Sequence, residues 1–340
     1  MAVTIKDVAK AAKVAPSTVS RVISDSPRIS DQTKKRVRQV MKELGYHPNY
    51  IARSLASNKA NVFGLVFPRS GNLAFQNPFY SEVLRGITQG VNEIKHGIQL
   101  AAGSNKDEIY NNVVQMVQGR RVDGIVMLYS QQKDKITNYL QGLNFPFVII
   151  GKPFENEGKI THIDNDNISA AKEGTEYLLN LGHEKIGFIG GNKNLMVTID
   201  RLAGYKEAME EAGLPVNEDY IVYEEFLISG GKHGIEQLMN LPEPPTALLV
   251  TDDLMSLGVL TTLREKKMQV PEDLSILSFN NSMFAELTDP ALTSIDINIP
   301  ELGYQAVTNL MAMINNPKEP VKRVIIPHTL IKRRSCKQNY

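Results

Sequence analysis

The chain has 340 residues, enough for more than one domain and a large buried core, and its net charge is +1. Its single cysteine, Cys336, cannot form a disulfide within the chain and gives little support to thiol or metal chemistry. No apolar run approaches the length of a membrane span, and residues 1–30 lack the apolar core of a signal peptide. We therefore expect a cytoplasmic protein.

The charge is distributed unevenly along the chain. Residues 1–60 contain 12 lysines and arginines but only 4 aspartates and glutamates, a net charge of +8, and the remainder carries −7. A basic head on an acidic body indicates a polyanionic partner, such as nucleic acid, at one end only.

The segment from Thr4 to Ile23 has the spacing of two short helices. Thr4 and Asp7 form a sequence pattern typical of a capping box, and Pro16 suits the first position of the second helix. The outward face of that helix carries short hydroxyls and one guanidinium, which suit phosphate oxygens and a guanine edge: Ser17, Thr18, Ser20, Arg21 and Ser24. The pattern predicts a helix-turn-helix, although a solvated amphipathic hairpin would have the same periodicity.

A third helix is predicted after a polar loop. Ser30 suits its N-cap, Gly45 its C-terminal end, and Pro48 prevents its continuation. Its predicted buried stripe consists of Thr33, Val37, Val40, Met41 and Leu44. We add Arg28 and Ser30 to the candidate DNA contacts.

The amino-acid sequence of this region resembles that of a known family. T-I-x-D-V-A-x-x-A-x-V-x-x-x-T-V-S-R-V-I closely resembles the N-terminal motif of the lactose/galactose repressor family, which implies a DNA-binding headpiece over residues 1–47. P-N-x-x-A-R-S-L resembles that family's hinge helix, which implies a hinge over 48–60 and minor-groove contacts by Asn49, Ala52 and Leu55. Two positions depart from the family pattern: Lys13 replaces the usual turn glycine, and Ala15 replaces the usual capping serine.

The remainder of the chain alternates β-rich runs with helix-like segments in two successive sets. This alternation predicts an α/β fold with two parallel sheets, each covered by helices on both faces. Ligands of open parallel sheets bind beyond the carboxyl ends of the strands, so the space between the two sheets is the expected site.

The resemblance extends to this body, which in the family is similar to a periplasmic sugar-binding protein. It implies an effector-binding and dimerisation domain over 61–340, in which the chain crosses between two subdomains. The implied N-subdomain covers about 61–164 and 297–323, and the implied C-subdomain covers about 165–296 and 324–340.

The resemblance also implies the effector contacts. The matching positions are Phe79, Tyr80, Asp166, Arg201, Phe226, Asp252 and Asn280. Taken singly, an arginine or an aspartate is usually a surface charge, and a phenylalanine is usually part of the core. Together they provide the carboxylate, amide, guanidinium and aromatic groups that hold sugars.

The residues around Asn280 bear on which sugar is bound. Most family members have Gly-Phe/Tyr-Asp-Asp here, whereas this chain has Ser278-Phe279-Asn280-Asn281. Because an amide both donates and accepts, we expect a neutral polyhydroxylated ligand. S-F-N-N-S and I-I-G-K-P are most similar to the maltose-operon repressors of the family, which favours maltose or a malto-oligosaccharide.

The expected protein is thus a repressor that binds a palindromic operator as a homodimer and is released by a small sugar, with no cofactor or metal. An alternative is a catabolite-control regulator with a phosphoprotein corepressor, but the counterpart of its docking surface, residues 299–317, contains no lysine or arginine. A second alternative is a sugar-binding protein without a DNA role, which the basic head opposes. The sequence lacks the G-x-G-x-x-G, P-loop, H-E-x-x-H and G-x-S-x-G motifs, so we do not expect an enzyme.

Overall fold

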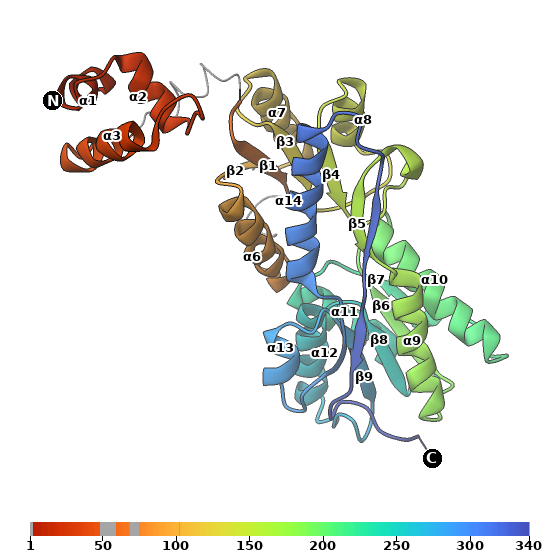
Figure 1. The fold of residues 1–340 in the computed structure, drawn as a ribbon. Helices are drawn as coiled ribbons and strands as arrows, with labels where there is room; N and C mark the ends of the chain where they lie inside the picture. Colours follow the sequence, from red (N-terminus) through yellow and green to blue (C-terminus); the bar gives the residue numbers. More distant parts are fainter. Residues whose placement is uncertain (1–2, 48–58, 69–74, 102, 340) are drawn as a thin grey trace. The chain divides into compact units, whose positions relative to one another are not determined.

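A computed structural model describes residues 3–47, 59–68, 75–101 and 103–339. They belong to two compact units, Met1–Ala60 and Asn61–Tyr340 (Figure 1). Within the described residues, no helix combines the length and the apolar character that crossing a membrane would require.

The first unit is a three-helix headpiece formed by α1 (Ile5–Ala11), α2 (Pro16–Ile23) and α3 (Asp31–Glu43). Its small core consists of Val8, Ala9, Ala12, Val19, Val22 and Val37. The predicted start of α1 is confirmed, because the Asp7 carboxylate accepts hydrogen bonds from the Thr4 backbone N–H at 2.9 Å and the Thr4 hydroxyl at 2.7 Å. The predicted buried stripe of α3 is wrong at Leu44, which is 37% exposed because it lies past the helix end.

The turn between α1 and α2 carries both departures from the family pattern. Lys13 adopts a left-handed conformation with φ of +52°, which a glycine would adopt without steric cost. Ala15 is the N-cap of α2 and provides no side-chain hydrogen bond to the helix. The helix-turn-helix therefore forms although its turn lacks a glycine and α2 lacks a side-chain N-cap.

The second unit contains two six-stranded sheets. The first has the strand order β11-β5-β4-β3-β1-β2, and all its pairings are parallel. Its strands are β1 (Val62–Val66), β2 (Gly97–Ala101), β3 (Gly124–Met127), β4 (Phe147–Ile150), β5 (His162–Asn165) and β11 (Arg323–Ile326). The buried residues of α6 (Pro78–Glu93) and α14 (Ile299–Asn315) share one core cluster, whereas those of α7 (Lys106–Gln118) and α8 (Lys135–Gly142) share another.

Helices α6 and α14 lie side by side along the first sheet (Figure 1). Their backbones approach closely at two glycines: a Cβ on Gly86 would lie 1.8 Å from the Pro300 carbonyl oxygen, and one on Gly303 would lie 2.2 Å from that of Val83. This close packing anchors the late segment α14 to a subdomain that is built mainly from earlier sequence.

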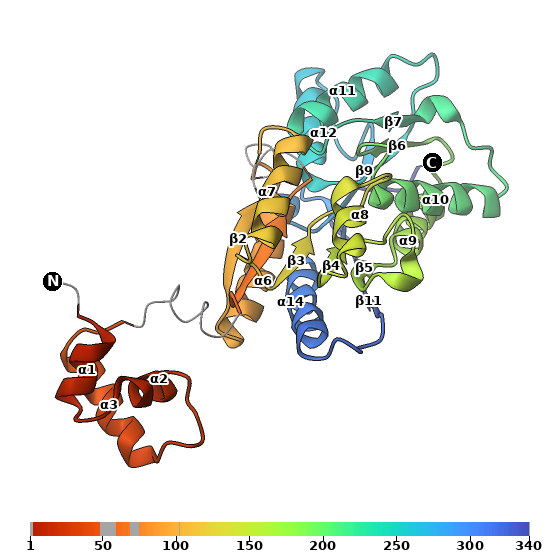
Figure 2. The same cartoon turned by 90° about the horizontal axis from the view of Figure 1, so that it is seen from above.

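The second sheet has the order β12-β10-β9-β8-β6-β7, parallel except for the edge strand β12. Its strands are β6 (Ile186–Gly190), β7 (Ile221–Tyr223), β8 (Ala247–Val250), β9 (Ser275–Phe279), β10 (Thr293–Asp296) and β12 (Thr329–Ile331). Helices α9 (Asn167–Asn180) and α10 (Met196–Glu211) cover one face, and α11 (Ile228–Met239) and α12 (Asp253–Glu265) cover the other (Figure 2). The short helix α13 (Met283–Leu287) follows β9.

The chain crosses between the two sheets three times. It crosses between β5 and α9, between β10 and α14, and between β11 and β12. The sequence places the third crossing near 323, but Arg323–Ile326 pairs with β5 in the first sheet, so this crossing lies after Ile326. The Asn165 side-chain amide joins the three crossings, since it donates to the carbonyl of Ile297 at 2.9 Å and to that of Ile326 at 2.8 Å.

Candidate functional site

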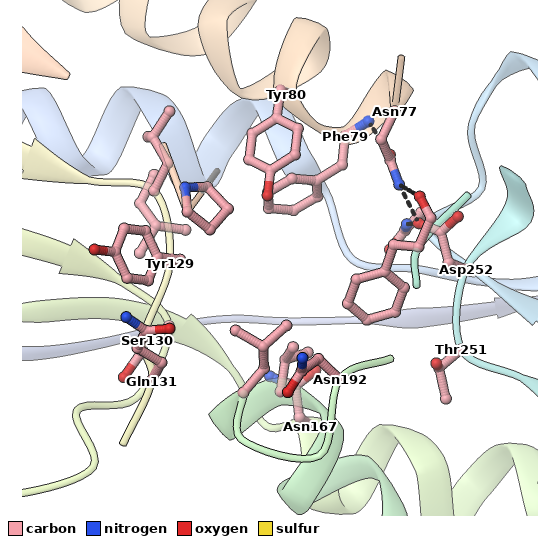
Figure 3. A pocket seen from close by; sticks show the side chains of 18 of the residues that line it. Asn77, Phe79, Tyr80, Tyr129, Ser130, Gln131, Asn167, Asn192, Thr251 and Asp252 are labelled. Carbon is pink, nitrogen blue, oxygen red and sulfur yellow. Dashed lines mark hydrogen bonds between the residues drawn. The ribbon is translucent and has the colours of Figure 1, made fainter. Parts of the chain in front are cut away.

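A cavity of about 240 Å³ lies between the two sheets of the body, at the strand ends (Figure 3). This volume is near the lower end for small-molecule pockets. The structure brings six of the seven side chains predicted to contact effector to its wall: Phe79, Tyr80, Arg201, Phe226, Asp252 and Asn280. They come from both subdomains, so a ligand in the cavity would contact both.

Asp166 is not among the residues that line the cavity. Its side chain is exposed and caps α9, where it accepts a hydrogen bond from the Ser169 backbone N–H at 3.0 Å. The turn from β5 into α9 directs its neighbours Asp164, Asn165 and Asn167 to the cavity instead.

Arg201 lies on α10 and is only 3% exposed. Its Nε donates to Asn167 Oδ1 at 3.0 Å, and its Nη1 donates to the Thr251 carbonyl at 2.7 Å. The guanidinium carbon lies 4.1 Å from the centre of the Phe279 ring. Burial lowers the pKa of Arg201 to about 10, so the side chain remains a cation at neutral pH.

Asp252 is the N-cap of α12 and is 3% exposed. Its Oδ1 accepts from the backbone N–H groups of Leu254 at 2.8 Å and Met255 at 3.2 Å. Its Oδ2 accepts from the side-chain amides of Asn77 at 3.0 Å and Asn280 at 2.9 Å. Burial raises the pKa of Asp252 to about 7, while these donors favour the ionised form. Four donors occupy about the full acceptor capacity of a carboxylate.

The cavity has aromatic and amide walls. Phe79 and Tyr80 meet edge to face with ring centres 5.3 Å apart. Phe226 packs on Gly191, where a Cβ would lie 2.2 Å from Cζ of the ring, so only glycine allows this position of the aromatic wall. Figure 3 shows Phe79 and Tyr80 on one side, with Asn167 and Asn192 reaching in from another.

Sequence reasoning missed several cavity residues that carry an amide or a carboxyl. They are Asn77, Gln131, Asp164, Asn165, Asn167, Asn192, Asn194 and Glu225. Their position in the sequence could have identified most of them, because they lie at or just after the end of a β-rich run and the expected site lies beyond the strand ends. Their pairing across the cavity could not be inferred, because residues such as Asn77 and Asp252 are far apart in sequence.

The headpiece presents most of its predicted DNA contacts to solvent. Ser17, Ser20, Arg21, Ser24, Arg28 and Ser30 are exposed, and Thr18 is half-buried. Two of these hydroxyls already have partners: Ser24 donates to the Arg21 carbonyl at 3.2 Å, and Ser30 caps α3 through the Thr33 backbone N–H at 3.4 Å. The predicted minor-groove residues Asn49, Ala52 and Leu55 lie outside the described residues.

A helix-turn-helix unit joined to a two-sheet binding body defines a DNA-binding transcriptional regulator. Residues 4–49 match the model of bacterial regulatory proteins of the lacI family, and residues 175–336 match the periplasmic binding protein-like domain. The HTH-type transcriptional regulator MalR of Streptococcus pneumoniae is 42% identical over 98% of this chain and 100% of its own length. The chain therefore belongs to the lacI family, whose members regulate transcription and are not enzymes.

Two solved structures show the same architecture. The structure of a transcriptional regulator CelR–cellobiose complex is 29% identical, covers 98% of this chain and 99% of its own, and has a TM-score of 0.77. The lac repressor dimer bound to operator and the anti-inducer ONPF is 24% identical, covers 99% and 100%, and has a TM-score of 0.84. The latter likeness establishes a shared fold.

Proposed function

We propose that this protein is a transcriptional repressor that binds a palindromic operator as a homodimer and is released by maltose or a short malto-oligosaccharide. The observation that carries the proposal is the convergence of Arg201, Asn280 and three aromatic rings on one cavity between the subdomains. The similarity to MalR over the full chain supports a malto-sugar, and the CelR–cellobiose complex supports a glucose disaccharide in such a body.

The DNA-binding part of the proposal depends on the headpiece. The exposed side chains of α2 are short hydroxyls and the Arg21 guanidinium, while Val19 and Val22 hold the helix to the core. In helix-turn-helix proteins such a helix enters the major groove, and a dimer then reads two half-sites. The net charge of +8 over residues 1–60 would supply a salt-dependent attraction to phosphates.

The sugar-binding part depends on groups that have hydrogen-bonding capacity left. Among the contacts of the described residues, Arg201 Nη2 and Asn280 Oδ1 have no protein partner. They would donate to and accept from adjacent sugar hydroxyls, and Phe226 would cover an apolar sugar face. A neutral disaccharide suits these groups, because the charges of Arg201 and Asp252 already face polar protein partners.

Sugar binding would control DNA binding through the arrangement of the subdomains. A ligand shifts an equilibrium only if its affinity differs between the two states, and a sugar that contacts both subdomains favours the arrangement in which it fits. Reciprocity then requires operator DNA to weaken sugar binding by the same factor.

The test is isothermal titration with maltose and maltotriose, paired with operator binding at zero and saturating sugar. Arg201→Lys retains the charge but loses the planar fork, so we expect sugar affinity to fall by at least about tenfold, whereas the exposed Arg264→Lys should behave as the parent. No heat with any α-glucoside would refute the malto-sugar. Sugar binding that leaves operator affinity unchanged would refute the control of DNA binding.

A further inference from the structure

We propose that Asn77 is a latch that closes the ligand cleft by bonding to Asp252 across the two subdomains, and that Asp252 is its anchor rather than a sugar contact. This inference rests on the proposed function, because it describes how the same cleft is poised to respond to its ligand. It assigns a positioning role to Asn77 and revises the role expected for Asp252.

Asn77 is fixed at both ends of its amide. Its Oδ1 accepts from the Phe79 backbone N–H at 2.9 Å and so caps α6, in the first subdomain. Its Nδ2 donates to Asp252 Oδ2 at 3.0 Å (Figure 3) and to the Phe226 carbonyl at 3.2 Å, and both partners belong to the second subdomain. The orientation of the amide is unambiguous, because only an oxygen can accept from the Phe79 N–H and only the nitrogen can donate to a carboxylate.

These bonds are buried, which makes the latch effective. Asn77 is 6% exposed and Asp252 is 3% exposed. A hydrogen bond to an ionised acceptor is stronger than a neutral one, and low local polarity strengthens it further. The contact with the Phe226 carbonyl also ties the loop that carries one aromatic wall to the helix that carries Phe79 and Tyr80.

The opposite rim of the cleft is closed in a different way. There the backbone N–H of Met196 donates to the Ser130 carbonyl at 3.2 Å, and that of Gln132 donates to the Asn194 carbonyl at 3.2 Å. Main-chain pairing holds that rim whatever its side chains are, whereas at the α6 rim the hydrogen bonds between described residues of the two subdomains come from the Asn77 amide. A substitution of Asn77 should therefore change how far the ligand cleft closes.

The occupied acceptors of Asp252 explain why it serves as the anchor. Oδ1 is used by two backbone N–H groups and Oδ2 by two amides, so a sugar hydroxyl could bind only by displacing one of them. Asn280, which donates to Asp252 through Nδ2, keeps Oδ1 for the ligand. The anchor thus orients a sugar-binding amide and holds the cleft closed at the same time.

The test changes the latch while preserving the cap of α6. Asn77→Ser retains an oxygen that can accept from Phe79 N–H but is too short to reach Asp252. Asn105→Ser is the matched control, because Asn105 caps α7 in the same subdomain by accepting from the Glu108 backbone N–H at 2.9 Å. Spin labels at the exposed positions Gln89 and Glu236, in a Cys336→Ser background of the full chain, report the distance between the subdomains.

Without any sugar, we expect Asn77→Ser to lengthen the label distance beyond the parental distribution, and Asn105→Ser to leave it unchanged. Asn77→Ser should also raise the maltose concentration for half-release of operator about tenfold, because a smaller fraction of the protein is closed. When ionised, Asn77→Asp keeps an acceptor for the Phe79 N–H but offers an oxygen where the amide donated to Asp252 and to the Phe226 carbonyl, so it should open the cleft as Asn77→Ser does.

An unchanged sugar-free distance in Asn77→Ser would overturn the latch, and so would an equal lengthening in Asn105→Ser. The distance measurement needs no ligand, so it separates this inference from the proposed function. If the cleft opens as expected but no α-glucoside binds, only the proposed function fails; if sugar releases operator from a cleft that Asn77 does not hold, only the latch fails.

Discussion

At the scale of single residues, Asp164 makes the body sensitive to pH. It is 7% exposed, and burial raises the pKa of its carboxyl to about 7. The folded body thus keeps a proton that the unfolded chain releases above about pH 4. Raising the pH from about 4 to 7 therefore lowers the free energy of unfolding through this group, by at most about 1.4 kcal/mol per pH unit.

Asp164→Asn should reduce that slope, because an amide does not titrate in this range. The variant keeps an oxygen that can accept from Asn167 Nδ2, as Asp164 does at 3.0 Å. The measurement is urea unfolding followed by far-UV circular dichroism between pH 5 and 8. Parallel slopes for parent and variant would show that Asp164 is ionised in the folded body throughout this range.

Cavity residues that match the family pattern were mostly predicted from the sequence. Cavity residues whose role depends on a partner far away in the sequence were not. Arg201, Asp252 and Asn280 reach the cavity as expected. Asp166 does not, because its carboxylate bonds to the Ser169 N–H at the solvent-exposed start of α9. Asn77 was missed because its significance comes from a partner 175 residues away.

At the scale of elements, the missing cap of α2 leads to a prediction. Ala15 has the extended backbone that an N-cap requires, with φ of −70° and ψ of 150°. Ala15→Ser should stabilise α2 by roughly 0.5–2 kcal/mol, because its hydroxyl can accept from a free N–H of the first turn. Slower hydrogen exchange of the α2 amides in the full chain would register the gain.

The control for this prediction is a substitution that should destabilise a helix by removing its cap. Ser30→Ala removes the existing cap of α3, so it should speed exchange in α3 by a comparable free energy. If neither substitution alters exchange in its helix, capping does not limit the stability of the headpiece.

The elements that the sequence did not predict are short or lie at sheet edges. Strands β11 and β12 lie at sheet edges and have mixed exposure, so their own residues form only a weak pattern. Edge strands gain their pairing from the sheet beside them, which a single segment does not reveal. The same reason explains the misplaced third crossing.

At the scale of the whole molecule, the headpiece should supply both affinity for DNA and choice of sequence. Arg21→Ala should reduce the preference for operator over random duplex by roughly 1–3 kcal/mol if Arg21 reads a guanine edge. Lys35→Ala on the exposed face of α3 is the comparison, because losing a phosphate contact weakens both duplexes equally. Anisotropy titrations on a selected operator and a scrambled duplex give the ratio, and an unchanged ratio for Arg21→Ala would exclude that contact.

The three crossings joined by Asn165 also bear on how the protein is made. The first subdomain begins at β1 but is completed by α14 and β11, near the end of the chain. When only residues 61–296 have emerged from the ribosome, the first sheet therefore lacks its strand β11. At that stage α6 also lacks its packing partner α14. The apolar faces of both stay uncovered until the last segments emerge, and such surfaces are where nascent chains associate wrongly or recruit chaperones. The two subdomains must finish folding almost together, so a late stop in translation would damage both.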